Sequence, residues 1–235
     1  LANNLQSFPV GIFGLSFAIA AFPAIAASAF DKERLVYYFS KTLRQIFYFI
    51  IPSTVVLILL RAQIVRLVLG SGKFDWNDTI LTMNTLTFFA LSLFAQATIP
   101  LLVRFYYARH DSRTPLYLGL IASAVNIVLN YYLVHSSLGV AALALSFSLS
   151  SIVQFALLFI FLRIELGSLD EGLLFKSIGK MLLAASAAGL VIQLMKTWLG
   201  FSLEISFGWQ LLLQFVLPAS TGLAVYGIVT YWLKS

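Results

Sequence analysis

Residues 79–103 of this chain, TILTMNTLTFFALSLFAQATIPLLV, contain no charged side chain. Folded as one α-helix they would extend roughly 37 Å, which is enough to cross a hydrocarbon core about 30 Å thick with some tilt. Both ends carry helix signals, because Asp75 and Asp78 offer side-chain acceptors before the stretch and Thr114 with Pro115 starts the next helix after a basic loop. The pattern predicts a membrane-spanning helix from which the rest of the chain can be oriented.

The whole chain has the composition of a membrane protein. Of its 235 residues, 60% are hydrophobic and 10% are charged, whereas soluble domains carry about 25% charged residues. We therefore predict an all-α, polytopic membrane helix bundle with about seven transmembrane helices. Residues 1–163 would hold five spans, and residues 164–235 would add a C-terminal helix pair. The predicted spans are residues 5–29, 45–60, 79–103, 115–134, 138–162, 178–195 and 209–233.

The lysine and arginine residues set a topology. Eleven of the 15 flank one set of span ends, and the other four flank the opposite set. By the positive-inside rule the larger group is cytoplasmic, which also places the C-terminus in the cytoplasm. We predict no nucleic-acid partner, because no basic face with interleaved aromatic residues remains once these charges are assigned to the membrane surface. The larger group is Lys32, Arg34, Lys41, Arg44, Arg104, Arg109, Arg113, Arg163, Lys176, Lys180 and Lys234; the smaller group is Arg61, Arg66, Lys73 and Lys196.

The patterns expected of a membrane enzyme are missing from the sequence. The nine acidic residues lie in loops or within about a turn of a predicted span end, so no carboxylate pair is placed at membrane depth for acid–base catalysis. His110 and His135 fall on opposite sides of the membrane in this topology, and cysteine is absent. No phosphate-binding P-loop motif occurs. We predict a transporter or a structural membrane module without enzymatic activity.

Polar side chains repeat on one face of several predicted spans. In the third span, Thr82, Thr85, Ser92 and Gln96 fall within an arc of about 80° at 100° per residue. The fourth and fifth spans repeat the arrangement, the fifth with polar residues at four-residue intervals. Interhelical hydrogen bonds explain each stripe alone, whereas several stripes on successive helices favour a hydrated central cavity. The polar residues are Ser123, Asn126 and Asn130 in the fourth span, and Ser146, Ser150 and Gln154 in the fifth span.

Three stretches resemble, in order and spacing, the C-terminal half of the MurJ/MviN family of lipid II flippases. They are residues 8–29 (FPVGIFGLSFAIAAFPAIAASA), 70–79 (GSGKFDWNDT) and 104–115 (RFYYARHDSRTP). This family is part of the superfamily of multidrug, polysaccharide and oligosaccharidyl-lipid exporters. The most specific part of the resemblance is the loop that contains Arg109, Asp111, Arg113, Thr114 and Pro115.

The resemblance implies a fold of two six-helix lobes with two further helices, of which this chain would supply most of the second lobe and the last pair. It implies export of the undecaprenyl-pyrophosphate-linked peptidoglycan precursor lipid II across the bacterial inner membrane by alternating access. The expected partners are the lipid bilayer, that precursor and a missing N-terminal lobe. The chain begins with Leu1, not Met, and without a signal-peptide pattern, so we expect an N-terminal portion to precede it.

At two positions the sequence departs from the family pattern. Asn3 and Asn4 stand where many members carry an acid–arginine pair, and Pro100 stands where many carry a lysine. Both differences remove positive charge from the expected cavity, so the alternatives stay open: another exporter of the superfamily, or a non-transporting scaffold that binds the lipid precursor. The candidates for lining the substrate cavity are Asn3, Asn4, Thr82, Thr85, Ser92, Gln96 and Ser123.

The resemblance also implies a cation site. Some members bind sodium with an Asn and an acid four residues apart, joined by a hydroxyl and a backbone carbonyl from the next helix. Asn126, Asn130, Ser146 and the carbonyl of Ala142 stand at about those places. Hard cations take oxygen ligands, which these groups offer, although Asn130 lacks the charge of the acid. We predict no other metal and no organic cofactor.

Overall fold

The fold is a bundle of long helices, seen in a computed structural model that describes residues 1–70, 76–135, 139–202 and 209–233. Six of its helical stretches are long and apolar enough to cross a membrane, and a seventh span consists of two helices that meet at 46°. No strand occurs in these four ranges. The prediction of an all-α bundle with about seven spans is therefore confirmed. Residues 71–75 of the predicted turn, with Lys73 and Asp75, and Lys234 lie outside the described residues.

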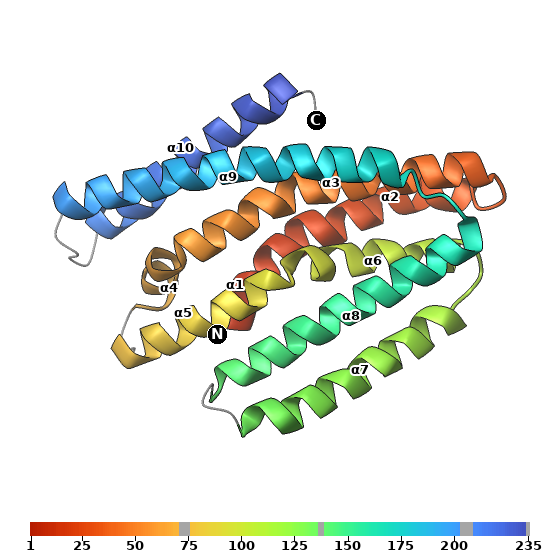
Figure 1. The fold of residues 1–235 in the computed structure, drawn as a ribbon, viewed down its shortest axis with the longest axis horizontal. Coiled ribbons are helices and arrows are strands. Elements are labelled where there is room, and N and C mark those ends of the chain that lie inside the picture. Colours follow the sequence, from red (N-terminus) through yellow and green to blue (C-terminus); the bar gives the residue numbers. More distant parts are fainter. Residues whose placement is uncertain (71–75, 136–138, 203–208, 234–235) are drawn as a thin grey trace.

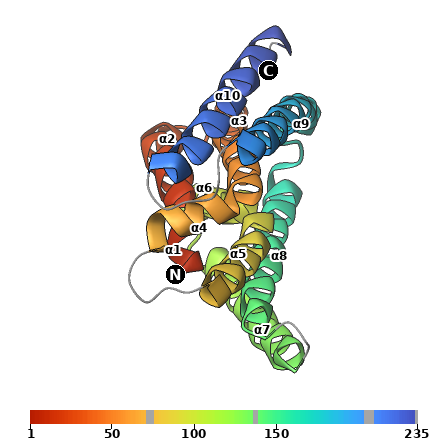
Figure 2. The same ribbon diagram turned by 90° about the vertical axis from the view of Figure 1, so that its left-hand side faces the viewer.

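The helices run side by side between two ends of the bundle, while the short helix α4 lies across one of these ends (Figures 1 and 2). In chain order they are α1 (Ala2–Pro9), the π-helix η1 (Val10–Leu15), α2 (Ser16–Ala27), α3 (Lys32–Leu59), α4 (Arg61–Leu69), α5 (Trp76–Leu91), α6 (Leu93–Ala108), α7 (Arg113–Val134), α8 (Ala141–Leu166), α9 (Glu171–Ser202) and α10 (Trp209–Leu233).

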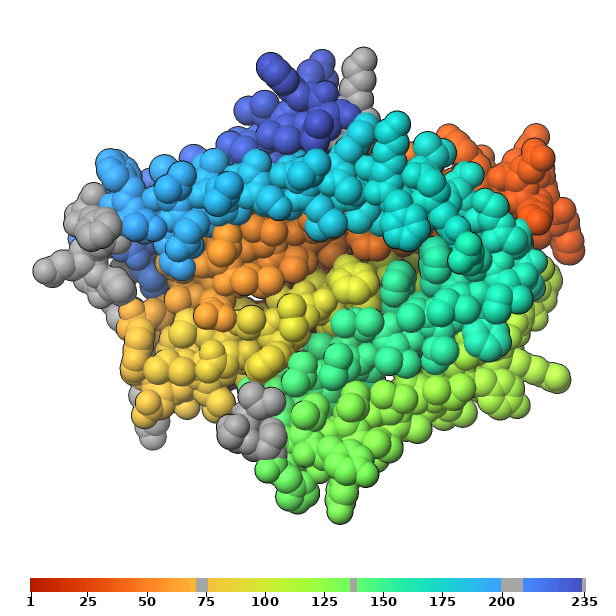
Figure 3. All heavy atoms as spheres, in the orientation of Figure 1, coloured from red at the N-terminus to blue at the C-terminus, as the bar shows by residue number. Residues whose placement is uncertain are grey.

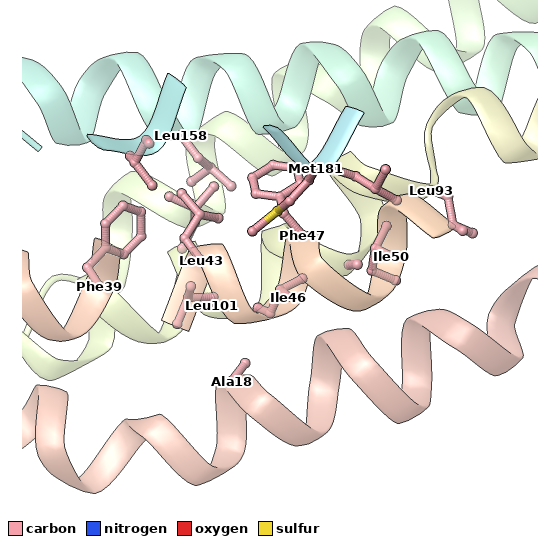
Figure 4. Close-up of a cluster of buried hydrophobic side chains, with 14 of the residues drawn as sticks. Ala18, Phe39, Leu43, Ile46, Phe47, Ile50, Leu93, Leu101, Leu158 and Met181 are labelled. Carbon is pink, nitrogen blue, oxygen red and sulfur yellow. The ribbon is translucent and has the colours of Figure 1, made fainter. Parts of the chain in front are cut away.

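Helix α3 forms the centre of the bundle. Phe39, Leu43, Ile46 and Ile50 follow one another along its buried face, and each is at most 2% exposed. They meet side chains from α2, α6, α8 and α9, as Figure 4 shows with Ala18, Leu101, Leu158 and Met181. The three- and four-residue spacing is that of a helix stripe, and burial of one such side chain contributes about 1.5–3 kcal/mol.

The predicted start of the second span at residue 45 is wrong, because α3 begins at Lys32. Leu35 and Phe39 extend the buried stripe toward the N-terminus, so residues 32–44, which the predicted span left out, belong to the same helix. Asp31 caps this end, since its Oδ1 accepts a hydrogen bond of 3.2 Å from the Arg34 N–H.

The first span is not a uniform α-helix. Between α1 and α2, residues Val10–Leu15 form one π-helical segment, where hydrogen bonds reach five residues instead of four. Within it, a Cβ atom built on Gly14 would lie 2.6 Å from the Ala97 carbonyl oxygen, so α6 packs directly against backbone here. Only glycine permits this approach.

The third span is broken at Ser92, which contradicts the prediction of one continuous helix over residues 79–103. The Ser92 N–H donates to the Phe89 carbonyl at 3.2 Å. In a regular α-helix it would donate to the Phe88 carbonyl, four residues back. That carbonyl instead accepts a hydrogen bond of 2.7 Å from the Ser148 hydroxyl on α8. The bend is thus held by a side chain from another helix and needs no proline or glycine at the break.

The C-terminal pair, α9 and α10, packs on the rest of the bundle through α3. The Tyr226 hydroxyl of α10 donates a 2.9 Å hydrogen bond to the Tyr48 carbonyl of α3, and the two rings are 5.4 Å apart. Between α9 and α10, Gly222 lets the helices approach, because its added Cβ would lie 2.3 Å from Ile192. The division of the chain into residues 1–163 and 164–235 remains a prediction.

Candidate functional site: a polar pocket and an apolar groove

A polar pocket of about 510 Å³ lies where η1, α6, α7 and α8 meet. Its polar side chains are all neutral hydroxyls and amides, and Pro100 stands among them. Two irregular segments, the π-helix and the proline-containing helix α6, therefore border a cluster of hydrogen-bonding groups. The lining residues are Val10, Gln96, Ile99, Pro100, Ala122, Ser123, Asn126, Ile127, Phe147, Ser150, Ser151 and Gln154.

The structure brings only some of the predicted cavity residues to this pocket. Gln96 and Ser123 line it, and so does Asn126, which was predicted for the cation site. Thr82 and Thr85 lie on α5, beyond the bend, and the Thr85 hydroxyl donates to the Leu81 carbonyl of its own helix at 2.7 Å.

The two asparagines at the start of the chain lie apart from the pocket as well. Asn3 and Asn4 are exposed on α1. The Asn3 Oδ1 atom accepts a 2.8 Å hydrogen bond from Gln6 Nε2, so this side chain is engaged locally. Neither asparagine is among the residues that line the pocket.

Ser92 is buried in a hydrogen-bond network that holds the bend of the third span. Gln96 Nε2 donates to Ser92 Oγ at 2.7 Å, and Ser92 Oγ donates to Ser148 Oγ at 3.0 Å. Ser148 completes the chain at the Phe88 carbonyl. Ser92 is 0% exposed, so its contact is with α8 and not with a cavity, whereas Gln96 links this network to the pocket.

The predicted cation ligands hold one another by hydrogen bonds. Asn130 Nδ2 donates to Asn126 Oδ1 at 2.9 Å, and Asn126 Nδ2 donates to Ser150 Oγ at 3.0 Å. Since α7 and α8 are antiparallel, this pairing places Asn130 one turn further along, at the level of Ser146.

The oxygen atoms at this level are neutral. The Ser146 hydroxyl donates to the Ala142 carbonyl at 2.9 Å, and Asn130 Oδ1 is buried without a hydrogen-bond partner among the described residues. An unpaired buried amide oxygen is a group that a hard cation could contact. The arrangement offers no carboxylate, and sodium binding remains a prediction.

Three polar residues of the pocket, Ser150, Ser151 and Gln154, were not among the predicted candidates. Ser150 and Gln154 line the pocket, and their spacing of four residues on the fifth span was the available signal. Their position beside Asn126 shows that the polar face of α8 meets that of α7 across the helix pair.

An apolar groove of about 1120 Å³ runs along the other face of α8, between α3 and α9. Figure 3 looks onto this face and shows α3 recessed beneath α9. The sequence offered no signal for the groove, because lipid-facing and groove-facing residues are equally apolar. The lining residues are Leu43, Phe47, Ile51, Thr54, Val55, Ile58, Leu59, Phe94, Phe155, Ala156, Phe159, Ile160, Glu171, Leu174, Phe175, Ile178, Leu182, Ala185, Ser186, Gly189, Leu190 and Gln193.

The loop between α6 and α7 is a compact turn. Asp111 Oδ1 accepts hydrogen bonds from the backbone N–H groups of Arg113 and Thr114, at 3.0 and 3.1 Å. The predicted helix start at Thr114 is one residue late, because α7 begins at Arg113 and Asp111 supplies the capping oxygen. Arg109, from the same loop, forms an ion pair with Glu165 at the end of α8. Pro115 follows in the first turn of α7 and is buried. The loop thus ties three helix ends together.

Replacing Asp111 with alanine is expected to destabilise the protein by about 1 kcal/mol, the usual cost of losing a helix-capping side chain. The hydroxyl and N–H of Thr114 hold the pKa of the Asp111 carboxyl below its ordinary value of 3.8. A lowered pKa means that the carboxylate stabilises the folded state at neutral pH and that this contribution disappears as the pH falls through the lowered pKa. Thermal unfolding of the purified protein in detergent measures the stability difference between wild type and Asp111→Ala. This difference should narrow only below pH 3.8. Asp111→Asn, which keeps an acceptor, serves as the control; a loss equal to that of alanine would contradict the cap.

Comparison with known proteins identifies the family to which the chain is related. The family model described as "Lipid II flippase MurJ" matches residues 1–212. The "Probable lipid II flippase MurJ" of Thermotoga maritima is 32% identical over 197 residues, which cover 83% of this chain and 39% of that protein. The "Lipid II flippase MurJ" of Thermosipho africanus is 29% identical over 142 residues, covering 60% of this chain and 29% of that one.

The fold is similar to a solved structure as well. The structure titled "Lipid II flippase MurJ, inward closed conformation" matches with a TM-score of 0.79 and 23% sequence identity, and the match covers 97% of this chain and 45% of that chain. This chain therefore spans less than half the length of the relatives it matches. The multi-pass helix bundle and the match over residues 1–212 agree, and the chain belongs to the MurJ family of lipid II flippases.

Proposed function

We propose that this chain is the second lobe and C-terminal helix pair of a lipid II flippase of the bacterial inner membrane. It would act with a first lobe to move the undecaprenyl-pyrophosphate-linked peptidoglycan precursor across the bilayer by alternating access. Family membership supports the proposal, and the share of the relatives' length that the chain spans supports the need for a first lobe. The proposal includes a cytoplasmic C-terminus, from the lysine and arginine distribution, and no enzymatic activity.

The observation that carries the proposal is the pairing of a polar pocket with an apolar groove in one bundle. Helices α6 and α8 border both, because Gln96 and Gln154 line the pocket while Phe94 and Phe155 line the groove. A lipid-linked sugar has the same two parts, a polar headgroup and a long apolar chain. Apolar surface in the groove would bind the chain, and neutral hydroxyls and amides would hydrogen-bond the sugar and peptide.

Within this proposal the pocket residues have separate roles. Gln96 and Ser123 would hydrogen-bond the headgroup, and Asn126 would support them through its bond to Ser150. The charge that a pyrophosphate needs is not in the pocket, whose polar groups are neutral. Cations from elsewhere in the protein would therefore hold the phosphates.

The proposal is tested in cells whose own lipid II flippase can be depleted. The full-length protein that carries this sequence is expressed during depletion, and lipid II accessible from outside the cell is measured. We expect both growth and externally accessible lipid II to be restored, and a Gln96→Ala variant to lower accessibility roughly tenfold, because a hydrogen bond to a substrate group is lost. Normal membrane insertion of the full-length protein without restored accessibility would overturn the proposal.

A further inference from the structure

Two cations meet at the elbow between α3 and α4. Arg61 begins α4, and its Nη1 donates a hydrogen bond of 2.5 Å to the Thr87 hydroxyl of α5. Lys196 of α9 reaches the same elbow, where its Nζ donates to the Leu59 carbonyl at 3.0 Å. Leu59 is also a lining residue of the apolar groove, and Gln193, one turn before Lys196, is another. The two charges therefore stand at one end of the groove.

No carboxylate neutralises this pair among the described residues. The ion pairs among the described residues all lie at the opposite end of the bundle (Figure 1). They are Arg34 with Asp31, Arg109 with Glu165, and Arg163 with Glu171. The Lys196 ammonium binds the backbone carbonyl two residues before Arg61, so the two cations share one elbow, and both side chains are half-buried. Two half-buried like charges with no carboxylate partner in the described part of the chain raise the energy of the site, and a bound anion would lower it.

Both cations keep donors for such an anion. A guanidinium has five N–H donors and an ammonium three, and the structure uses one of each. Arg66, the other described cation nearby, is engaged differently, because its guanidinium stacks 4.4 Å from the Trp76 ring centre. Among the described cations of this end, Arg61 and Lys196 thus keep donors that can bind phosphate oxygens.

The length of the groove indicates which kind of lipid would carry the phosphate. Its residues on α9 extend from Glu171 to Gln193, roughly 33 Å at 1.5 Å per residue. One leaflet of hydrocarbon is about 15 Å thick, half of the bilayer core, so an apolar chain that fills the groove is longer than one leaflet. A polyprenyl chain has that length, whereas the acyl chains of a phospholipid end near the bilayer centre.

We propose that Arg61 and Lys196 bind the phosphate of a polyprenyl lipid whose chain lies in the groove between α3, α8 and α9. The inference rests on the proposed function for its substrate class and adds a phosphate site on the side of the membrane that carries few cations. It would hold the lipid at the end of the transport path opposite to the ion-paired loops.

Direct binding to the purified full-length protein tests the site. Undecaprenyl pyrophosphate, undecaprenol and inorganic pyrophosphate are titrated separately and followed by native mass spectrometry. Arg61→Gln and Lys196→Gln keep a donor for Thr87 and Leu59 but remove the charge. Lys176→Gln removes an exposed charge at the other end of α9 and is the matched control. We expect about tenfold weaker binding of the pyrophosphate lipid in each site variant and no change in the control, since charge-assisted hydrogen bonds are lost.

The remaining measurements separate the alternatives. Undecaprenol should bind all variants equally, inorganic pyrophosphate should bind far more weakly than the lipid, and Lys196→Arg should keep wild-type affinity. Wild-type affinity in both glutamine variants, or equal loss of undecaprenol binding, would overturn the site. Displacement of the polyprenyl lipid by equimolar phosphatidylglycerol would overturn the polyprenyl assignment. Failure of the cellular lipid II assay with these binding results intact would refute the transport function alone.

Discussion

A Gly14→Ala substitution is expected to lower the free energy of unfolding by about 1–3 kcal/mol, the range typical of overpacked sites. The added methyl group would lie 2.6 Å from the Ala97 carbonyl oxygen and 2.7 Å from its Cα atom. Both are backbone atoms of α6, so no side chain can rotate away and the first span must move from the third. The effect is measured as thermal unfolding of the purified full-length protein and as its yield in the membrane.

Gly11→Ala is the matched control for this substitution. Gly11 lies in the same π-helix, but no heavy atom stands within 4 Å of its added Cβ. We expect unchanged or slightly higher stability, because alanine favours helix over glycine. Equal destabilisation by both substitutions would show that glycine flexibility, and not the approach of α6, is what the segment requires.

Ser186→Trp is expected to lower lipid II transport roughly tenfold or more, because an indole would occupy the apolar groove. Ser186 lines the groove on α9 and is exposed, so the substitution displaces no buried side chain. Its hydroxyl donates to the Leu182 carbonyl one turn back on the same helix, at 2.9 Å. Transport is measured as externally accessible lipid II in depleted cells, with membrane levels of the protein checked in parallel.

The control for a groove-filling tryptophan is Leu183→Trp. Leu183 lies on the same helix, is 67% exposed, and is not among the groove residues. Transport should stay near wild type in this variant. Equal losses in the two variants would attribute the effect to tryptophan on α9 and would remove the groove from the transport path.

The sequence predicted the fold class and the spans well, because an uncharged helix long enough to cross a bilayer has few other environments. It placed α7 and α10 nearly at their observed bounds. It missed the start of α3 at Lys32, because charged residues lie near that end although Leu35 and Phe39 are already on the buried stripe. Charge near a helix end is compatible with a buried opposite face.

The candidate site was predictable only in part. Thr82 and Thr85 share a face with Gln96 in a straight helix, and the bend at Ser92 breaks that relation. The bend depends on Ser148, which is distant in sequence and whose hydroxyl resembles any other polar residue of the fifth span. The apolar groove and the elbow cations arise from the packing of α3 against α9, which periodicity does not encode.

The π-helix of the first span changes the direction in which the residues of α2 face. Each residue added to a helix turns the chain by about 100°, and a π-helical segment accommodates an added residue as a bulge. The half of the span after η1 is therefore rotated relative to the half before it. In that second half, Ala18 and Ile25 are both 0% exposed and lie two turns apart on one buried face of α2. Deleting Gly11, whose added Cβ would have no heavy atom within 4 Å, would turn α2 away from α3 and α6 while Gly14 and its contact partner Ala97 stay in the chain.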